Sequence, residues 1–299
     1  MSAFSLFGVI LICTIWGAGF PFMKIGLLYL PPFLYVGIRF TITALCVLIY
    51  MRLTRDEWRF GRKMFWWMAA LSAFFYIQQG LIFLGLTYTT AGRMGVILNT
   101  QPIITAVAAH WFVEHDKLTW GKVAGLLMAV FGVFFVFRES FAEFNRTIFF
   151  GDLLALIAAV AWGSQTVVTK HVVKHVTPSA IIFWQAAASS VCFFATSVFL
   201  DPDPIPKQAI DLTFVGVTAY VILISTVFGF VGWVYLILHN NPSRVASFCF
   251  ITPIASVVFA WIILGEPITS DIIIATGLVG LGIFIANFRA KQEPAPKVA

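Results

Sequence analysis

Two proline-containing segments have the residue types and spacing of a possible substrate-binding site. Pro102 and Pro253 each lie inside a long apolar run. A proline has no N–H for the carbonyl four residues earlier, so each should leave a backbone oxygen free, on Leu98 and Cys249, at membrane depth. Prolines at matching places in two halves of a membrane protein indicate a substrate site. The alternative is that each proline only kinks its helix for packing.

Polar and aromatic side chains at helical spacing are the candidate substrate contacts around these breaks. Amide side chains facing lipid would lose their hydrogen bonds, and tryptophan rings can contact a cation. Gly17 and Pro21 would interrupt a third helix beside Trp16. For each aromatic residue, packing or an interfacial position is an equally good interpretation. The candidate set is Trp16, Phe20, Tyr76, Gln79, Asn99, Trp162, Gln165, Tyr220 and Ser225.

Arg39 lies roughly two turns into its apolar run and is the one full charge that we expect deep in the membrane. A guanidinium group there could bind the carboxylate of a substrate. The favoured alternative is structural: the side chain would snorkel to the outer interface or pair with an acid at a helix end.

The carboxylates argue against an enzyme and against a proton-coupled carrier. None of the 13 lies in the middle of an apolar run, and no catalytic, metal-binding or phosphate-binding motif is present. We therefore expect no enzymatic activity, no metal and no cofactor, with uniport or facilitated export as the first hypothesis. Glu114 and Glu266 are interpreted as loop anchors that accept from helix N-termini around Thr119 and Thr269.

The composition is that of an integral membrane protein. The chain has 299 residues, 60% of them hydrophobic, and only 11% charged, against roughly 25% in a soluble domain. Apolar runs of about 20 residues can each cross a bilayer. The basic residues form no groove-sized patch, so we expect no nucleic acid, and a monomer and a homodimer are both open. The ten runs are 5–28, 32–53, 64–87, 92–114, 119–138, 149–172, 178–200, 212–238, 242–264 and 268–289.

The chain also repeats itself. Trp16-Gly17 recurs as Trp162-Gly163 at an offset of 146, and Pro102 recurs as Pro253 at an offset of 151. Because each copy has an odd number of runs, the second must enter the membrane from the opposite side, which predicts inverted repeats over 1–144 and 145–299. Thirteen Lys and Arg residues gather on the side that would hold both termini and five on the other, which predicts cytoplasmic termini.

With these motifs, the sequence resembles the drug/metabolite transporter superfamily and, within it, the ten-helix EamA-type carriers. The resemblance rests on Trp16-Gly17 through Lys24, on Arg39-Phe40, on the two proline segments, and on Gly265-Glu266-Pro267-Ile268-Thr269 with the glycine-spaced helix that follows. It implies an all-α membrane protein of two inverted five-helix repeats around a central cavity, with runs 119–138 and 268–289 at the periphery. These two runs also carry small-residue stripes that predict close packing.

The resemblance implies a bacterial inner-membrane carrier that exports amino acids and related small metabolites by alternating access. Its partners would be a small zwitterionic substrate and the lipid bilayer. Two alternatives stay open. An organellar exchanger of nucleotide sugars or phosphorylated sugars would need several buried Lys or Arg, and only Arg39 is available. A membrane-embedded enzyme or a scaffold without transport is the alternative from another class.

Overall fold

The computed structural model describes residues 2–57, 59–112, 119–142, 145–201, 209–240, 245 and 248–288, and it forms no strand in them. Six helical segments are long and apolar enough to cross a membrane, and further apolar helices are shorter. The chain is therefore a multi-pass, all-helical membrane protein. The elements are α1 (Ala3–Gly26), α2 (Pro32–Thr54), η1 (Arg62–Met64), α3 (Phe65–Leu86), α4 (Ala91–Leu98), α5 (Gln101–Phe112), α6 (Trp120–Ala142), α7 (Arg146–Val172), α8 (Pro178–Leu200), α9 (Leu212–Ala219), η2 (Tyr220–Phe228), α10 (Gly229–His239), η3 (Phe248–Phe250), α12 (Ile251–Leu264) and α13 (Ser270–Phe288).

Local sequence explains where several helices begin. Pro32 and Pro178 occupy first turns, as predicted, because a proline there loses no intrahelical hydrogen bond. Asp211 accepts from the N–H of Phe214 at the start of α9, and this bond holds the pKa of the Asp211 carboxyl below its usual value. The expectation for Glu114 lies outside the described residues.

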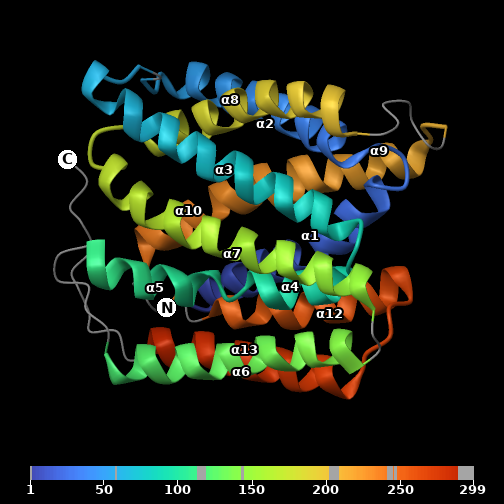
Figure 1. The fold of residues 1–299 in the computed structure, drawn as a ribbon. Coiled ribbons are helices and arrows are strands. Elements are labelled where there is room, and N and C mark those ends of the chain that lie inside the picture. The colour runs from blue at the N-terminus through green and yellow to red at the C-terminus, as the bar shows by residue number, and fades with distance from the viewer. Residues whose placement is uncertain are drawn as a thin grey trace.

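Helices α6 and α13 lie side by side at one edge of the bundle (Figure 1), in the peripheral place that the family resemblance implies. Their small-residue stripes meet, as predicted. A Cβ atom added to Gly125 would lie 2.5 Å from the Gly282 carbonyl oxygen, and one added to Gly132 would lie 2.9 Å from the Ala275 carbonyl oxygen. The glycines therefore allow the two backbones to approach more closely than any larger residue would.

The first helix of each sequence half packs mainly against helices of the other half. Helix α7 lies against α3, α4 and α5, whereas α1 lies against α9, η2, α10 and α12. Helices α2 and α8 pack along each other (Figure 1). The sequence halves are thus interleaved. We name α3, α4, α5 and α7 group A, and α1, α9, η2, α10 and α12 group B; α4 also packs closely against α12 and so lies between the two groups.

The two ends of the bundle differ in how continuous the buried apolar core is. We call the end where α1 begins the terminal face, and the end where α1 finishes at Gly26 the distal face. One continuous buried cluster fills the distal half, includes residues of α1, α2, α3, α4 and α9, and extends along α6 and α13 toward the terminal face. Toward the terminal face lie two separate clusters, one around Met51 and Leu71 and the other around Val9 and Leu236. Groups A and B are therefore joined by apolar packing in the distal half.

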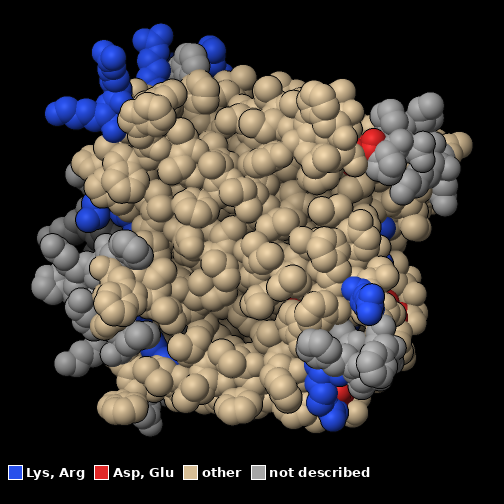
Figure 2. Space-filling view, in the orientation of Figure 1, with Lys and Arg blue, Asp and Glu red and all other residues tan. Residues whose placement is uncertain are grey.

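Charged side chains on the visible surface lie at the two ends of the helices (Figure 2). The broad face between them shows no Lys, Arg, Asp or Glu, and large apolar side chains such as Phe131, Val191 and Leu223 are exposed on helices of the bundle. An apolar belt with charged ends is the surface that a bilayer solvates.

Two local features differ from the sequence predictions or were absent from them. Helix α1 runs unbroken through Gly17 and Pro21, so the predicted third interruption is wrong; the helix tolerates the proline because only one intrahelical bond is lost. The run 212–238 contains a π-helix, η2, that no sequence pattern predicted. Of the run 242–264, only Val245 and the residues from Phe248 onward are described.

Candidate functional site

The predicted break before Pro102 is present. Helix α4 ends at Leu98, and α5 begins at Gln101 with Pro102 in its first turn. Asn99 caps the C-terminus of α4 with two hydrogen bonds. Its backbone N–H and its side-chain Nδ2 both donate to the Gly95 carbonyl, at 3.2 and 2.7 Å. Among the described residues, none donates a backbone hydrogen bond to the Leu98 carbonyl, as the missing proline N–H predicts.

The second break lies at the equivalent place in the second half. The 3₁₀ turn η3 covers Phe248–Phe250, which at the offset of 151 corresponds to 97–99 at the end of α4. Pro253 then lies in the first turn of α12. Each proline thus lies in the first turn of its α-helix, which is the N-terminal position that proline favours.

Trp16, Tyr220 and Ser225 are brought together where α1 meets the π-helix. Trp16 Nε1 donates to the Ser225 carbonyl at 3.0 Å, and the Tyr220 hydroxyl donates to the Ile15 carbonyl at 3.0 Å. A π-helix shifts its hydrogen-bond register and is frequent at functional sites. Phe20 lies on the same helix as Trp16 but is only 7% exposed, inside the distal core. These four residues belong to group B.

The remaining candidates of the first and second halves lie on α3 and α7, respectively. Gln165 of α7 accepts a hydrogen bond from Gln78 of α3, and both side chains are buried. Tyr76 points to α8, where its hydroxyl lies 2.5 Å from Thr196 Oγ1. These contacts join helices to each other, so packing explains the orientation of Tyr76 and Gln165. Gln79 is half-buried and Trp162 is 37% exposed.

Arg39 is buried and pairs with no acid among the described residues, so the favoured structural interpretation is wrong. Its side chain is buried, Nη2 donates to Thr226 Oγ1 of η2 at 3.0 Å, and Nη1 lies 3.5 Å from Met23 Sδ. The guanidinium carbon lies 5.0 Å from the centre of the Phe40 ring and 5.6 Å from that of Phe83. The helix geometry explains the error, because residue 39 faces α1 and η2 instead of lipid.

Glu266 anchors a loop, but to a different helix from the one predicted. Its carboxylate accepts from the N–H groups of Ala91 and Gly92, at 2.8 and 3.0 Å, and so caps α4 instead of the helix after Thr269. Lys24 Nζ lies 3.1 Å from Glu266 Oε1 and donates to the Thr89 carbonyl at 2.7 Å. These bonds tie α1 and the end of α12 to the start of α4. We call this set the distal lock, because it joins groups A and B at the distal face.

Neutralising the distal lock should open the distal face more often. With Glu266→Gln, the cap of α4 loses its charge at a cost of about 1–2 kcal/mol, which corresponds to a factor of roughly 5–30 in the closed population. The measurement is the labelling rate of a single cysteine placed at Leu27, in a background without the four native cysteines, by an impermeant thiol reagent. Glu57→Gln, an exposed acid at the terminal face, is the control. Equal rates in the two variants would contradict the role of the lock.

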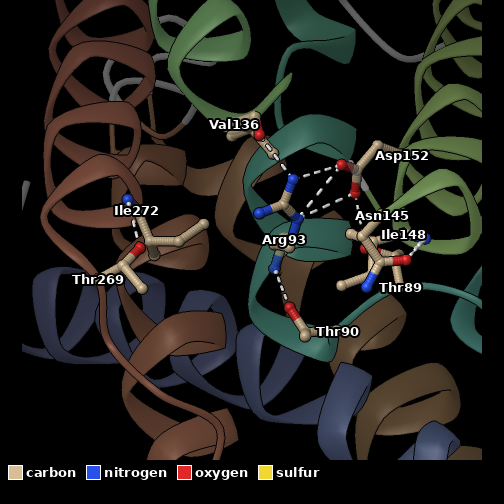
Figure 3. Close-up of polar contacts among 9 residues, drawn as sticks. All are labelled: Thr89, Thr90, Arg93, Val136, Asn145, Ile148, Asp152, Thr269 and Ile272. Atoms are coloured by element: carbon tan, nitrogen blue, oxygen red, sulfur yellow. Dashed lines mark hydrogen bonds and ion pairs between the residues drawn. The ribbon is translucent and has the colours of Figure 1, made fainter. Parts of the chain in front are cut away.

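A buried ion pair, which the sequence did not predict, lies next to the lock (Figure 3). Arg93 Nη2 lies 2.5 Å from Asp152 Oδ2, and Nε donates to both carboxylate oxygens at 3.2 Å. Thr89 Oγ1 donates to the same carboxylate at 2.6 Å, and Arg93 also donates to the Val136 carbonyl at 2.6 Å. Asp152 is 0% exposed. Arg39 is therefore not the only charge deep in the protein, and the network joins α4, α6 and α7.

Two glycines hold the first helix of each half against its neighbour. A Cβ atom added to Gly17 would lie 2.5 Å from Ala255 Cβ, and one added to Gly163 would lie 2.7 Å from Ile104 Cγ2. The two glycines differ by 146 and their two partners by 151, the offsets of the sequence repeat. The contact between α1 and α12 therefore has an equivalent between α7 and α5.

A bundle of long apolar helices with buried charges is the structure of a polytopic membrane protein. The model of the EamA-like transporter family matches the chain twice, over residues 3–138 and 149–288. The chain therefore belongs to the EamA-like transporter family.

Full-length relatives agree with this assignment. The uncharacterized transporter YoaV of Bacillus subtilis is 28% identical, over 95% of this chain and 96% of its own. A probable amino-acid metabolite efflux pump of Escherichia coli is 24% identical, over 97% of this chain and 96% of its own. A crystal structure with 17% identity aligns with a TM-score of 0.66 and covers 97% of this chain and 99% of its own, which shows that the fold is shared.

Proposed function

We propose that this protein exports amino acids and related small metabolites across the inner membrane of a bacterium by alternating access. Two relatives, in Escherichia coli and Salmonella typhimurium, are named probable amino-acid metabolite efflux pumps and match the chain over 97% and 98% of its length. The observation that best supports alternating access is that groups A and B pack against each other more extensively at the distal end than at the terminal end. They share one continuous core in the distal half and lie in different clusters toward the terminal face.

The proposed architecture is ten spans in two inverted repeats, 1–144 and 145–299. The two matches of the family model support it. So do two equivalent contacts between α2 and α8. Asp201, which follows α8, accepts from the N–H groups of Phe33 and Leu34 at the start of α2. Asp56, which follows α2, accepts from the Ser179 hydroxyl at the start of α8, at 2.7 Å. An acid after each helix thus binds the start of the other, as an inverted repeat requires.

The proposed resting state is closed at the distal face and open toward the terminal face. Helix α4, in the distal half, is buried along its whole length, whereas the only buried side chain among those described in α5 is Ile103. The distal lock closes the same end. Because most basic residues lie on the terminal side, we assign that face to the cytoplasm. Substrate would then enter from the cytoplasm, between groups A and B.

The substrate site proposed for this path keeps the sequence candidates and places them on two walls. Trp16, Phe20, Tyr220 and Ser225 belong to group B, and Tyr76, Gln79, Trp162 and Gln165 belong to α3 and α7 of group A. Asn99 with Pro102, and Pro253, mark the helix breaks between the walls. An exchanger of doubly charged phosphate esters is a weaker proposal, because Asp152 already neutralises Arg93.

The proposed function is tested by flux from liposomes that contain the purified protein. A panel of labelled amino acids should leave these vesicles faster than vesicles without protein, with and without a pH gradient. Equal rates without the gradient would add proton coupling to the mechanism. If no compound on the panel leaves faster under any gradient, the proposal fails.

A further inference from the structure

Arg39 is a buried cation whose charge is not balanced by any carboxylate among the described residues. Its side chain is 7% exposed, and Nε has no hydrogen-bond partner in the described part of the chain. The partners that it does have, the Thr226 hydroxyl and the Met23 sulfur, are neutral. Burying a charge without a counter-charge is costly, so a site of this kind is completed by an anion.

The position equivalent to Arg39 in the second repeat carries a neutral donor. At the offset of 146, Gln185 of α8 corresponds to Arg39 of α2. Gln185 is also buried, at 5% exposure, and its Nε2 has no hydrogen-bond partner among the described residues. Each copy of the repeat therefore presents a free donor at the same place, and only the first copy adds a positive charge.

The neighbours of Arg39 connect it to the candidate substrate site. Thr226, which accepts from Arg39, follows Ser225, whose carbonyl accepts from Trp16. The π-helix is thus contacted at consecutive residues by Arg39 from α2 and by Trp16 from α1. Thr226 also donates to the Val221 carbonyl, so its hydroxyl is already used as a donor and can only accept from Arg39.

We propose that Arg39 binds the carboxylate of the transported substrate and makes the protein selective for compounds that carry one. The free Nε and the Nη groups form a planar set of donors that fits the two oxygens of a carboxylate. This inference rests on the proposed function, because it needs a substrate that the protein transports.

The test compares amino acids with the amines that lack only the carboxylate. Liposomes with purified protein take up labelled leucine and isoamylamine, or phenylalanine and phenethylamine, in parallel. The wild type should transport at least one amino acid about tenfold faster than its amine. Arg39→Gln, which copies the equivalent residue of the other repeat, should reduce this ratio to near one. Arg52→Gln, an exposed arginine on the same helix, is the control and should keep the ratio.

Arg39→Lys tests the same role if the Arg39→Gln variant does not fold into the membrane. It keeps the charge but loses the planar donors, so KM for the amino acid should rise about tenfold while uptake of the amine stays the same. Equal transport of amine and amino acid by the wild type would overturn the role of Arg39 and leave the proposed function standing. So would an unchanged ratio in Arg39→Gln. If none of the four compounds is transported, the proposed function fails for these substrates and the inference fails with it.

Discussion

Asp152→Asn is expected to be the most destabilising single substitution considered for this protein, at about 3–5 kcal/mol. It removes the charge that balances Arg93 but leaves the guanidinium buried, at 4% exposure, in the network of α4, α6 and α7. An asparagine can accept only part of the four hydrogen bonds that Arg93 and Thr89 now donate to the carboxylate. The measurement is the apparent melting temperature of the detergent-solubilised protein.

Two further variants make this result specific. Asp211→Asn makes the same chemical change at an exposed helix cap, and because asparagine also caps helices it should cost only about 0.3–1 kcal/mol. The double variant Arg93→Met with Asp152→Leu removes both charges, and it should be more stable than Asp152→Asn because neither charge of this ion pair then stays buried. A melting temperature for Asp152→Asn equal to that of Asp211→Asn would show that the ion pair contributes little.

Gly17→Ala should destabilise the protein by about 1–3 kcal/mol, although alanine is the better helix former. The added methyl group would lie 2.5 Å from Ala255 Cβ and 2.7 Å from the Thr252 carbonyl oxygen, so α1 and α12 must move apart. If the repeats are equivalent, Gly163→Ala should act in the same direction against α5. Thermal unfolding in detergent and the initial rate of flux in liposomes are the two measurements.

Gly277→Ala provides the matched control for these glycines. Gly277 lies inside α13, is exposed, and has no atom within 4 Å of an added Cβ atom. Substitution there should raise stability by up to about 1 kcal/mol through helix propensity alone. The prediction is therefore a difference in sign between two chemically identical changes. Destabilisation of the same size at both positions would contradict the close contact at Gly17.

Features that depend on one stretch of sequence were predicted well. Pro32 and Pro178 start helices because a proline in a first turn costs no hydrogen bond, and the break at Asn99 follows from Pro102. The contact of Gly125 with Gly282 follows from stripes of small residues that allow close approach. The family was also predicted, because its motifs recur in both halves and the family model matches both.

Features that depend on two distant stretches were missed or misjudged. Arg93 and Asp152 are 59 residues apart, and each alone has the pattern of a charge at a helix end. Glu266 was assigned to the nearest helix start, but folding brings the more distant start of α4 to it. The interleaving of the two halves also arises only in three dimensions. The roles of Trp16, Gln79, Trp162 and the other site residues stay predictions until transport is measured.

The central claim, transport of amino acids by alternating access, is tested most directly by trans-stimulation in liposomes. The initial uptake of a labelled amino acid is measured into vesicles that are empty inside and into vesicles loaded with the same unlabelled compound. A carrier that returns faster when loaded should show severalfold faster uptake into the loaded vesicles, and Gly17→Ala should reduce both rates. Uptake no faster than into protein-free vesicles, or unaffected by the internal amino acid, would contradict the account.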